Sequence, residues 1–84
     1  MTTPTDTFTS EYYLADLGKQ IKARRKKLDM SIRYCAESVN MSYAYLSNIE
    51  NGKANPTLKE LHSIANGLGM NLHVELCSPP KNGN

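Results

Sequence analysis

The sequence predicts an all-α fold of four to five short helices, and three observations support this fold class. Apolar residues recur with the helical period in four stretches. Ser31, Ser42 and Thr57 stand where three of these stretches begin, as N-cap residues do. Asn40, Gly52 and Gly69 follow three of them, where a left-handed residue can end a helix.

The chain has 84 residues, which is enough for one small domain with a modest core. We divide it into an N-terminal arm (1–10), a helical domain (11–70), a strand (71–78) and a flexible tail (79–84). The arm is mostly Thr with Pro4 and is expected to be disordered. Dimer formation would add stability to so small a core.

The first helix is predicted over residues 11–28, and Gly18 within it would allow close packing. Its apolar face consists of Leu14, Leu17, Ile21 and Leu28. The fourth helix is predicted over residues 58–68, after a capping box formed by Thr57 and Glu60. Its apolar face consists of Leu58, Leu61, Ile64, Ala65 and Leu68.

Between them, two short helices are predicted over residues 31–39 and 42–50. The first buries Cys35, Ala36 and Val39, with Ile32 nearby. Asn40 tolerates a left-handed backbone and forms a tight turn before the second helix, which docks through Leu46 and Ile49. This arrangement predicts a helix-turn-helix unit. The opposite face of residues 42–50 is uncharged and rich in hydrogen-bonding groups, which suits contact with base edges.

Residues 71–77 change to a period of two, because Leu72, Val74 and Leu76 alternate with polar residues. This pattern favours a strand. A lone strand is unstable in water, so we expect it to pair with the same strand of a second copy across a two-fold axis. The alternative is a short fifth helix over the same residues.

Positive charge is concentrated rather than abundant, with 10 Lys and Arg against 8 Asp and Glu. Clustered basic charge suits an anionic partner, although a solvated helix face would look the same. The cluster within residues 19–27 comprises Lys19, Lys22, Arg24, Arg25, Lys26 and Lys27.

Several other classes of protein find no support in the sequence. Cys35 and Cys77 lack metal-ligand spacing with His62 and His73, so we expect free thiols, no metal and no cofactor. No catalytic motif suggests an enzyme. No stretch is apolar enough for a membrane span or a signal peptide, so a cytoplasmic protein is expected.

Residues 17–70, and above all the segment YLSNIENGKANPTLKEL, resemble the Cro/C1-type (XRE-like) helix-turn-helix family of phage repressors and bacterial regulators. The resemblance implies a lambda-repressor-like fold. It also implies a sequence-specific regulator that binds double-stranded DNA, acting as a homodimeric repressor at a near-palindromic operator.

The family roles carry over by position. Residues 42–50 match the recognition helix, and the base-contacting positions are Tyr43, Ala44, Ser47 and Asn48. Asn48 can bind adenine in a bidentate manner. The backbone-contacting positions are Ser31, Ile32, Arg33, Ser42, Asn51 and Lys53, with Tyr45 beside the backbone or at the edge of the core. Arg25 matches an arginine that pairs with Glu50, although from the sequence alone it could be another solvated cation.

Three features depart from the family pattern. Ile32 replaces a common glutamine, which removes a side-chain contact to phosphate, and Cys35 replaces a leucine. The tail looks like the dimerising strand of antitoxins that pair with kinase toxins, which implies a possible toxin partner. A further alternative is a protein-interaction module that has kept the fold and lost DNA binding.

Overall fold

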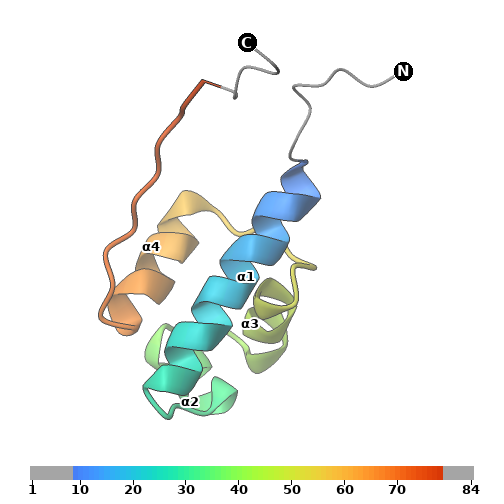
Figure 1. The fold of residues 1–84 in the computed structure, drawn as a ribbon. Coiled ribbons are helices and arrows are strands. Elements are labelled where there is room, and N and C mark those ends of the chain that lie inside the picture. The colour runs from blue at the N-terminus through green and yellow to red at the C-terminus, as the bar shows by residue number, and fades with distance from the viewer. Residues whose placement is uncertain (1–8, 79–84) are drawn as a thin grey trace.

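A computed structural model describes residues 9–78 and contains four helices: α1 (Ser10–Lys27), α2 (Ile32–Ser38), α3 (Tyr43–Glu50) and α4 (Leu58–Gly67). Helix α1 runs diagonally across the molecule, with α4 along one side and α2 and α3 packed around its lower half (Figure 1). The predicted all-α fold and helix-turn-helix unit are confirmed.

Every helix begins at a Ser or Thr whose hydroxyl accepts a hydrogen bond from a first-turn N–H. Such caps satisfy one of the donors that a helix N-terminus leaves free. The predicted caps Ser31, Ser42 and Thr57 are present. Thr57 and Glu60 form the predicted capping box, in which each side chain bonds the other residue's backbone N–H.

Every helix also ends in the same way, with a left-handed residue just after the C-cap. These residues are Asp29, Asn40, Gly52 and Gly69, with φ of 59°, 63°, 73° and 69°. After α2, for example, the Asn40 N–H donates to the Glu37 carbonyl and the Met41 N–H donates to the Ala36 carbonyl. This pair of bonds is the Schellman motif, and it turns the chain sharply from α2 toward α3.

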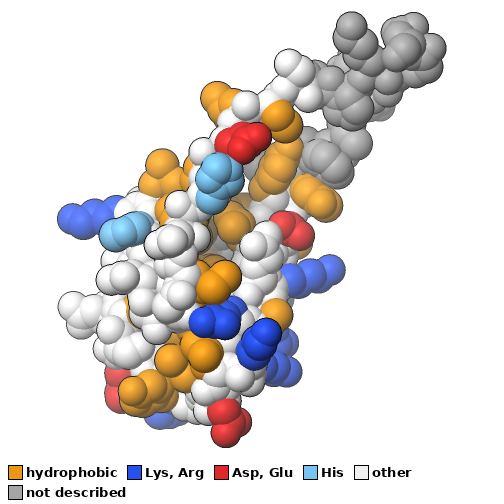
Figure 2. All heavy atoms as spheres, turned by 60° about the vertical axis from the view of Figure 1, so that its left-hand side comes forward, with side chains coloured by type: hydrophobic (Ala, Val, Ile, Leu, Met, Phe, Trp, Pro, Cys, Tyr) orange, Lys and Arg blue, Asp and Glu red, His pale blue; other side chains and the backbone are white. Residues whose placement is uncertain are grey.

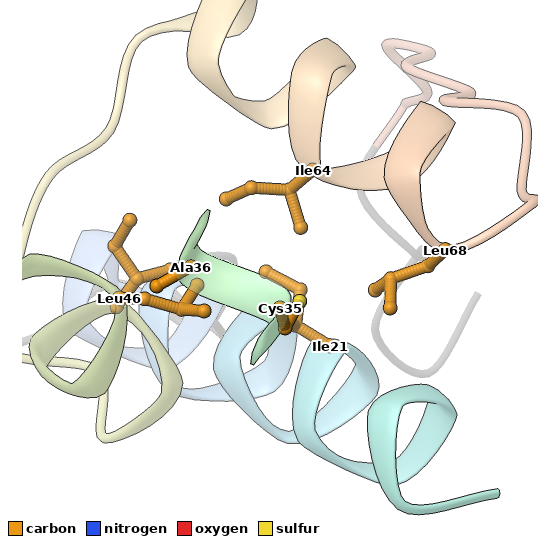
Figure 3. Close-up of a cluster of buried hydrophobic side chains, with 7 residues drawn as sticks. Ile21, Cys35, Ala36, Leu46, Ile64 and Leu68 are labelled. Carbon is orange, nitrogen blue, oxygen red and sulfur yellow. The ribbon is translucent and has the colours of Figure 1, made fainter. Parts of the chain in front are cut away.

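All four helices contribute to one small hydrophobic core, part of which is shown in Figure 3. Leu46, Ile64 and Cys35 are its largest fully buried side chains. The complete buried set is Ile21, Cys35, Ala36, Leu46, Ile49, Ile64 and Leu68. Core positions on both helices of the helix-turn-helix unit therefore fix α2 and α3 relative to α1 and α4.

Several boundaries and burial predictions need correction. Helix α1 begins at Ser10 after the N-cap Thr9, so these two residues are not part of a disordered arm, and residues 1–8 lie outside the described range. Leu28 and Leu58 remain 39% and 60% exposed, although each was predicted on a buried face. Both lie at helix ends, Leu28 as the C-cap of α1 and Leu58 as the first residue of α4. Val39 is only half-buried.

Residues 71–78 form neither a helix nor a strand in this single chain. The fifth helix is thus not observed, and the predicted strand would require a second copy. The tail runs back beside α4 (Figure 1), and the predicted flexible tail over residues 79–84 lies outside the described range. Among the described helices, none combines the length and apolar character needed to cross a bilayer.

Candidate nucleic-acid interface

Helix α1 is joined to α3 by one buried ion pair. Arg25 Nε donates to Glu50 Oε2 at 2.7 Å, and Nη2 donates to Oε1 at 3.0 Å. The third nitrogen, Nη1, donates to the Met30 carbonyl at 2.8 Å. The hydrogen bond to Glu50 raises the pKa of Arg25, against a smaller opposing effect of burial. The sequence-based pairing is therefore present, and Arg25 is occupied within the protein.

A close backbone contact lies on the same side of α1. A Cβ placed on Gly18 would stand 2.5 Å from the carbonyl oxygens of both Ile49 and Glu50. Only glycine lets α1 approach the C-terminal end of α3 this closely. The contact and the ion pair together fix the end of the recognition helix against α1.

The outward face of α3 is polar and accessible. Tyr43, Ala44 and Asn48 are exposed, Ser47 is half-buried, and Leu46 and Ile49 are buried on the opposite side. The four predicted base-contacting residues are thus brought together on one helix of eight residues. A helix of this kind fits the major groove, where such side chains can reach base edges.

One contact at this face was missed by sequence reasoning. The Arg33 guanidinium of α2 lies 4.9 Å from the centroid of the Tyr43 ring on α3. Both residues are exposed. A cation over a ring face is an attractive arrangement, and it links a predicted phosphate-contacting residue to a predicted base-contacting one. No local pattern connects two residues on different helices, so only the turn geometry could have indicated it.

Tyr45 is turned away from that face toward α4. Its hydroxyl donates to Glu60 Oε1 at 2.7 Å, and the same oxygen accepts from the Thr57 N–H at 2.9 Å. The bond to Glu60 raises the pKa of Tyr45, while the Thr57 N–H and then the Tyr45 hydroxyl lower the pKa of Glu60. Because a phosphate oxygen only accepts, the predicted contact of Tyr45 with DNA competes with this bond.

The other predicted backbone-contacting residues surround α3. Asn51 and Lys53 are exposed just beyond its end, and Ser42 is exposed at its start. Ser31 is exposed at the start of α2, where its hydroxyl accepts from the Tyr34 N–H and keeps its own proton. Ile32 is half-buried against the core, so only its backbone N–H is suited to a phosphate.

The basic cluster of α1 has two parts with different roles. Arg24 Nε donates to the Leu68 carbonyl at 3.0 Å, so Arg24, like Arg25, ties α1 to another part of the fold. The remaining members are exposed: Lys19, Lys22, Lys26 and Lys27. These four lysines are therefore available to an anionic partner.

The two cysteines are free thiols, and they differ in environment. Cys35 is fully buried, and desolvation raises the pKa of its thiol, so it acts as a core packing residue. Cys77 is exposed in the tail. Residues 9–78 hold no group of three or more side chains suited to a metal ion.

Residues 21–74 match the HTH_3 helix-turn-helix family, and this segment includes the ion pair, both helices of the turn unit and α4. The chain belongs to this family. Solved structures agree: the clp gene regulator ClgR from Corynebacterium glutamicum superposes with a TM-score of 0.70 at 25% identity, over 77% of this chain and 80% of that one. An HTH_3 family transcriptional regulator from Vibrio cholerae gives 0.70 at 32% identity, over 74% of this chain and 35% of that one.

Relatives of this HTH_3 chain include three regulators. The immunity repressor protein of Bacillus phage phi105 is 39% identical over 54 residues, which is 64% of this chain and 38% of that protein. The control protein C.MunI of Mycoplasma sp is 41% identical over 66% of this chain and 74% of that one. A transcriptional regulator of Sinorhizobium fredii is 47% identical over 75% of this chain and 80% of that one.

Membership in HTH_3 identifies a helix-turn-helix domain of the kind found in DNA-binding transcriptional regulators, and none of the relatives described above is named as an enzyme. The match covers only 38% of the phage repressor's length. The relatives described above are named as a repressor, a control protein and regulators, so the resemblance of the tail to antitoxins has no support.

Proposed function

We propose that this protein is a homodimeric repressor that places α3 in the major groove of a near-palindromic operator. The observation that carries the proposal is the exposed, uncharged face of α3, held rigidly from behind by Arg25 and Glu50. The name of the phage immunity repressor supports repression as the mode of action.

Base readout is assigned to α3. Asn48 is exposed in the C-terminal half of the helix and can bind adenine N6 and N7 together. Ala44 suits a thymine methyl group, and Tyr43 can donate to a base acceptor. Ser47 is half-buried and would reach a base edge through its hydroxyl.

Backbone contacts are assigned to residues around α3, because phosphate contacts supply much of the affinity and its salt dependence. Lys53, just after α3, and Arg33 on α2 are exposed cations, and some of Lys22, Lys26 and Lys27 would join them. Neutral contacts come from Ser31, Ser42, Asn51 and the Ile32 N–H. Tyr45 would pass close to the backbone without donating to it, since its proton is held by Glu60.

Specificity requires two copies, because one eight-residue helix reads only a few base pairs. A two-fold dimer would set two α3 helices about 34–36 Å apart, one turn of DNA, on symmetric half-sites. Leu72, Val74 and Leu76 are the residues that we assign to this dimer.

Selection of bound duplexes from a random pool, with the mass of each complex measured, tests the proposal. We expect recovered sequences to contain two inverted half-sites and the complexes to contain two protein chains. Recovery of unrelated sequences at physiological salt, or of complexes with one chain and one half-site, would contradict it.

A further inference from the structure

The tail leaves the domain as a segment whose backbone N–H and C=O groups could pair with another strand. Within the described part of the chain, the last backbone hydrogen bond runs from the Met70 N–H to the Ala65 carbonyl, and residues 71–78 follow it. His73 Nε2 lies 2.8 Å from Glu75 Oε1, so these two side chains share one side of the tail. This is the alternation of a strand.

The apolar side of the tail is only partly covered. Leu72 is half-buried and lines a pocket of about 230 Å³ between α1 and α4, together with Leu17 and Leu61. Val74 and Leu76 are 62% and 97% exposed. Figure 2 shows this side of the molecule, where apolar side chains gather around the tail. The tail thus begins against the domain and then presents two large apolar side chains to solvent.

The spacing of these side chains is self-complementary under a two-fold axis. In an antiparallel pair, directly opposed residues lie on the same face, so apolar residues must oppose apolar residues. Pairings that oppose Val74 to His73 or Glu75 of the second copy break this rule. The two-fold axis must therefore lie between the two copies of one residue, which face each other across it.

With the axis at Val74, each Leu72 opposes Leu76 of the second copy, and the two Val74 side chains meet. On the other face each His73 opposes Glu75 of the second copy, which places imidazole and carboxylate together twice. Such pairs stabilise neighbouring strands.

The two neighbouring centres are less complementary, and an axis at Leu72 or Leu76 would pair only three of these residues. An axis at Glu75 would oppose two carboxylates and set Leu72 against Ser78. An axis at His73 would oppose two imidazoles and leave Glu75 against Asn71. Opposed like charges destabilise a strand pair.

We propose that residues 71–77 of two copies form an antiparallel ribbon whose two-fold axis passes through Val74. This inference rests on the proposed dimer and specifies its register. The apolar face of the ribbon carries Leu72, Val74 and Leu76, and it continues the surface of the pocket between α1 and α4 in each domain.

Engineered cysteines in the full-length chain test the register, with the buried Cys35 kept in every variant. With Cys77 replaced by Ser, the variants Val74→Cys, His73→Cys and Glu75→Cys are oxidised mildly with diamide, and intermolecular disulfides are measured by non-reducing electrophoresis. Opposed Cα atoms lie about 4.5–5.5 Å apart, within disulfide range. Residues offset by two positions lie beyond the roughly 7 Å limit, because each residue advances about 3.4 Å. We expect Val74→Cys to crosslink fastest.

A charge exchange provides a second measurement that does not depend on cysteine reactivity. Glu75→Lys should weaken the dimer roughly tenfold by sedimentation, because it replaces two attractive pairs. Adding His73→Glu to this variant should restore the dimer. Cys77 in the wild-type chain opposes Asn71, so it should not crosslink.

Three outcomes would overturn the ribbon: fastest crosslinking at His73→Cys or Glu75→Cys, no crosslinking in a chain that sediments as a dimer, or a charge exchange without rescue. In those cases a dimer that still binds inverted half-sites leaves the proposed function intact. A wild-type chain that is monomeric on its operator contradicts both proposals.

Discussion

The Arg33 guanidinium lies 4.9 Å from the centroid of the Tyr43 ring and joins the two helices of the turn unit on their exposed side. The core joins the same two helices from within, through Cys35, Ala36 and Leu46. The orientation of the Tyr43 ring, which we assign to base contact, thus depends on a residue that we assign to phosphate contact.

Arg33→Lys keeps the charge but replaces a planar guanidinium by an ammonium group. We expect operator binding to weaken by about 0.5–1 kcal/mol, the usual size of an exposed cation–π contact, with no change in the salt slope. Measuring Kd by titration over a range of salt concentrations checks both. In a Tyr43→Leu background, Arg33→Lys should cost much less, and fully additive effects would show that the two residues are not coupled.

Asn48→Ala should weaken operator binding by about 1–3 kcal/mol and relax the preference at one base pair in each half-site. The reason is the loss of a bidentate contact that only one base pair can make. Binding to a library of single-base operator variants measures both the affinity and the base preference. Asn66→Ala, an exposed asparagine on α4, is the matched control and should change neither affinity nor preference. An unchanged preference profile for Asn48→Ala would remove Asn48 from the readout.

Lys53→Ala should weaken binding to operator and random DNA alike, because a phosphate contact carries no sequence information. The plot of log Kd against log salt concentration should become shallower by about one unit. Lys19→Ala removes an exposed cation outside the assigned contacts and should leave the slope unchanged. Equal slopes for wild type and Lys53→Ala would mean that Lys53 does not contact phosphate.

Gly18→Ala should destabilise the fold, although the same change at an exposed helix position stabilises by about 0.5–1 kcal/mol. The new Cβ would stand 2.5 Å from two carbonyl oxygens of α3, so the backbone of α1 or α3 must move. We expect a loss of about 1–3 kcal/mol in urea unfolding, as for other overpacked sites. Lys19→Ala on the same helix should stay within about 0.5 kcal/mol of wild type. A stabilised Gly18→Ala variant would contradict this close approach.

Glu60 should make stability depend on pH in the acidic range. Its pKa is lowered from the ordinary 4.5, chiefly by the Thr57 N–H and then by the Tyr45 hydroxyl. A lowered folded-state pKa adds stability above the unfolded value, and this stability is lost as pH falls through the folded value. The stability difference between wild type and Glu60→Gln should therefore be largest near neutrality and narrow below pH 4.5.

Thermal unfolding of both proteins from neutral to acidic pH measures this difference. Tyr45→Phe serves as a control, because it removes one of the two groups that donate to the Glu60 carboxylate. In this background the stability difference between the chain with Glu60 and its Glu60→Gln variant should change less with pH. A constant difference between wild type and Glu60→Gln across that range would show that the carboxylate charge at Glu60 does not stabilise the fold.

The helices could be predicted because their signals are local. A Ser or Thr cap acts within three residues, and a left-handed Asn or Gly ends a helix within two. The predicted ends of the helices therefore differ from the observed ends by no more than one residue. Burial was less predictable. Periodicity gives the apolar face of a helix, but whether Leu28 or Leu58 is covered depends on where neighbouring helices end.

Contacts between distant residues were beyond the sequence pattern. Arg24 was assigned to a basic cluster, yet it bonds a carbonyl 44 positions away. The cation–π contact of Arg33 and the hydrogen bond of Tyr45 likewise cross from one helix to another. The pairing of Arg25 with Glu50 was available only through the family resemblance, because composition cannot separate a buried arginine from a solvated one.

The neighbouring residues Arg24 and Arg25 hold the last turn of α1 to two other helices. Arg25 bonds Glu50 at the end of α3, and Arg24 bonds the Leu68 carbonyl just after α4. A substitution that shifts this one turn would therefore disturb the ends of α3 and α4 together.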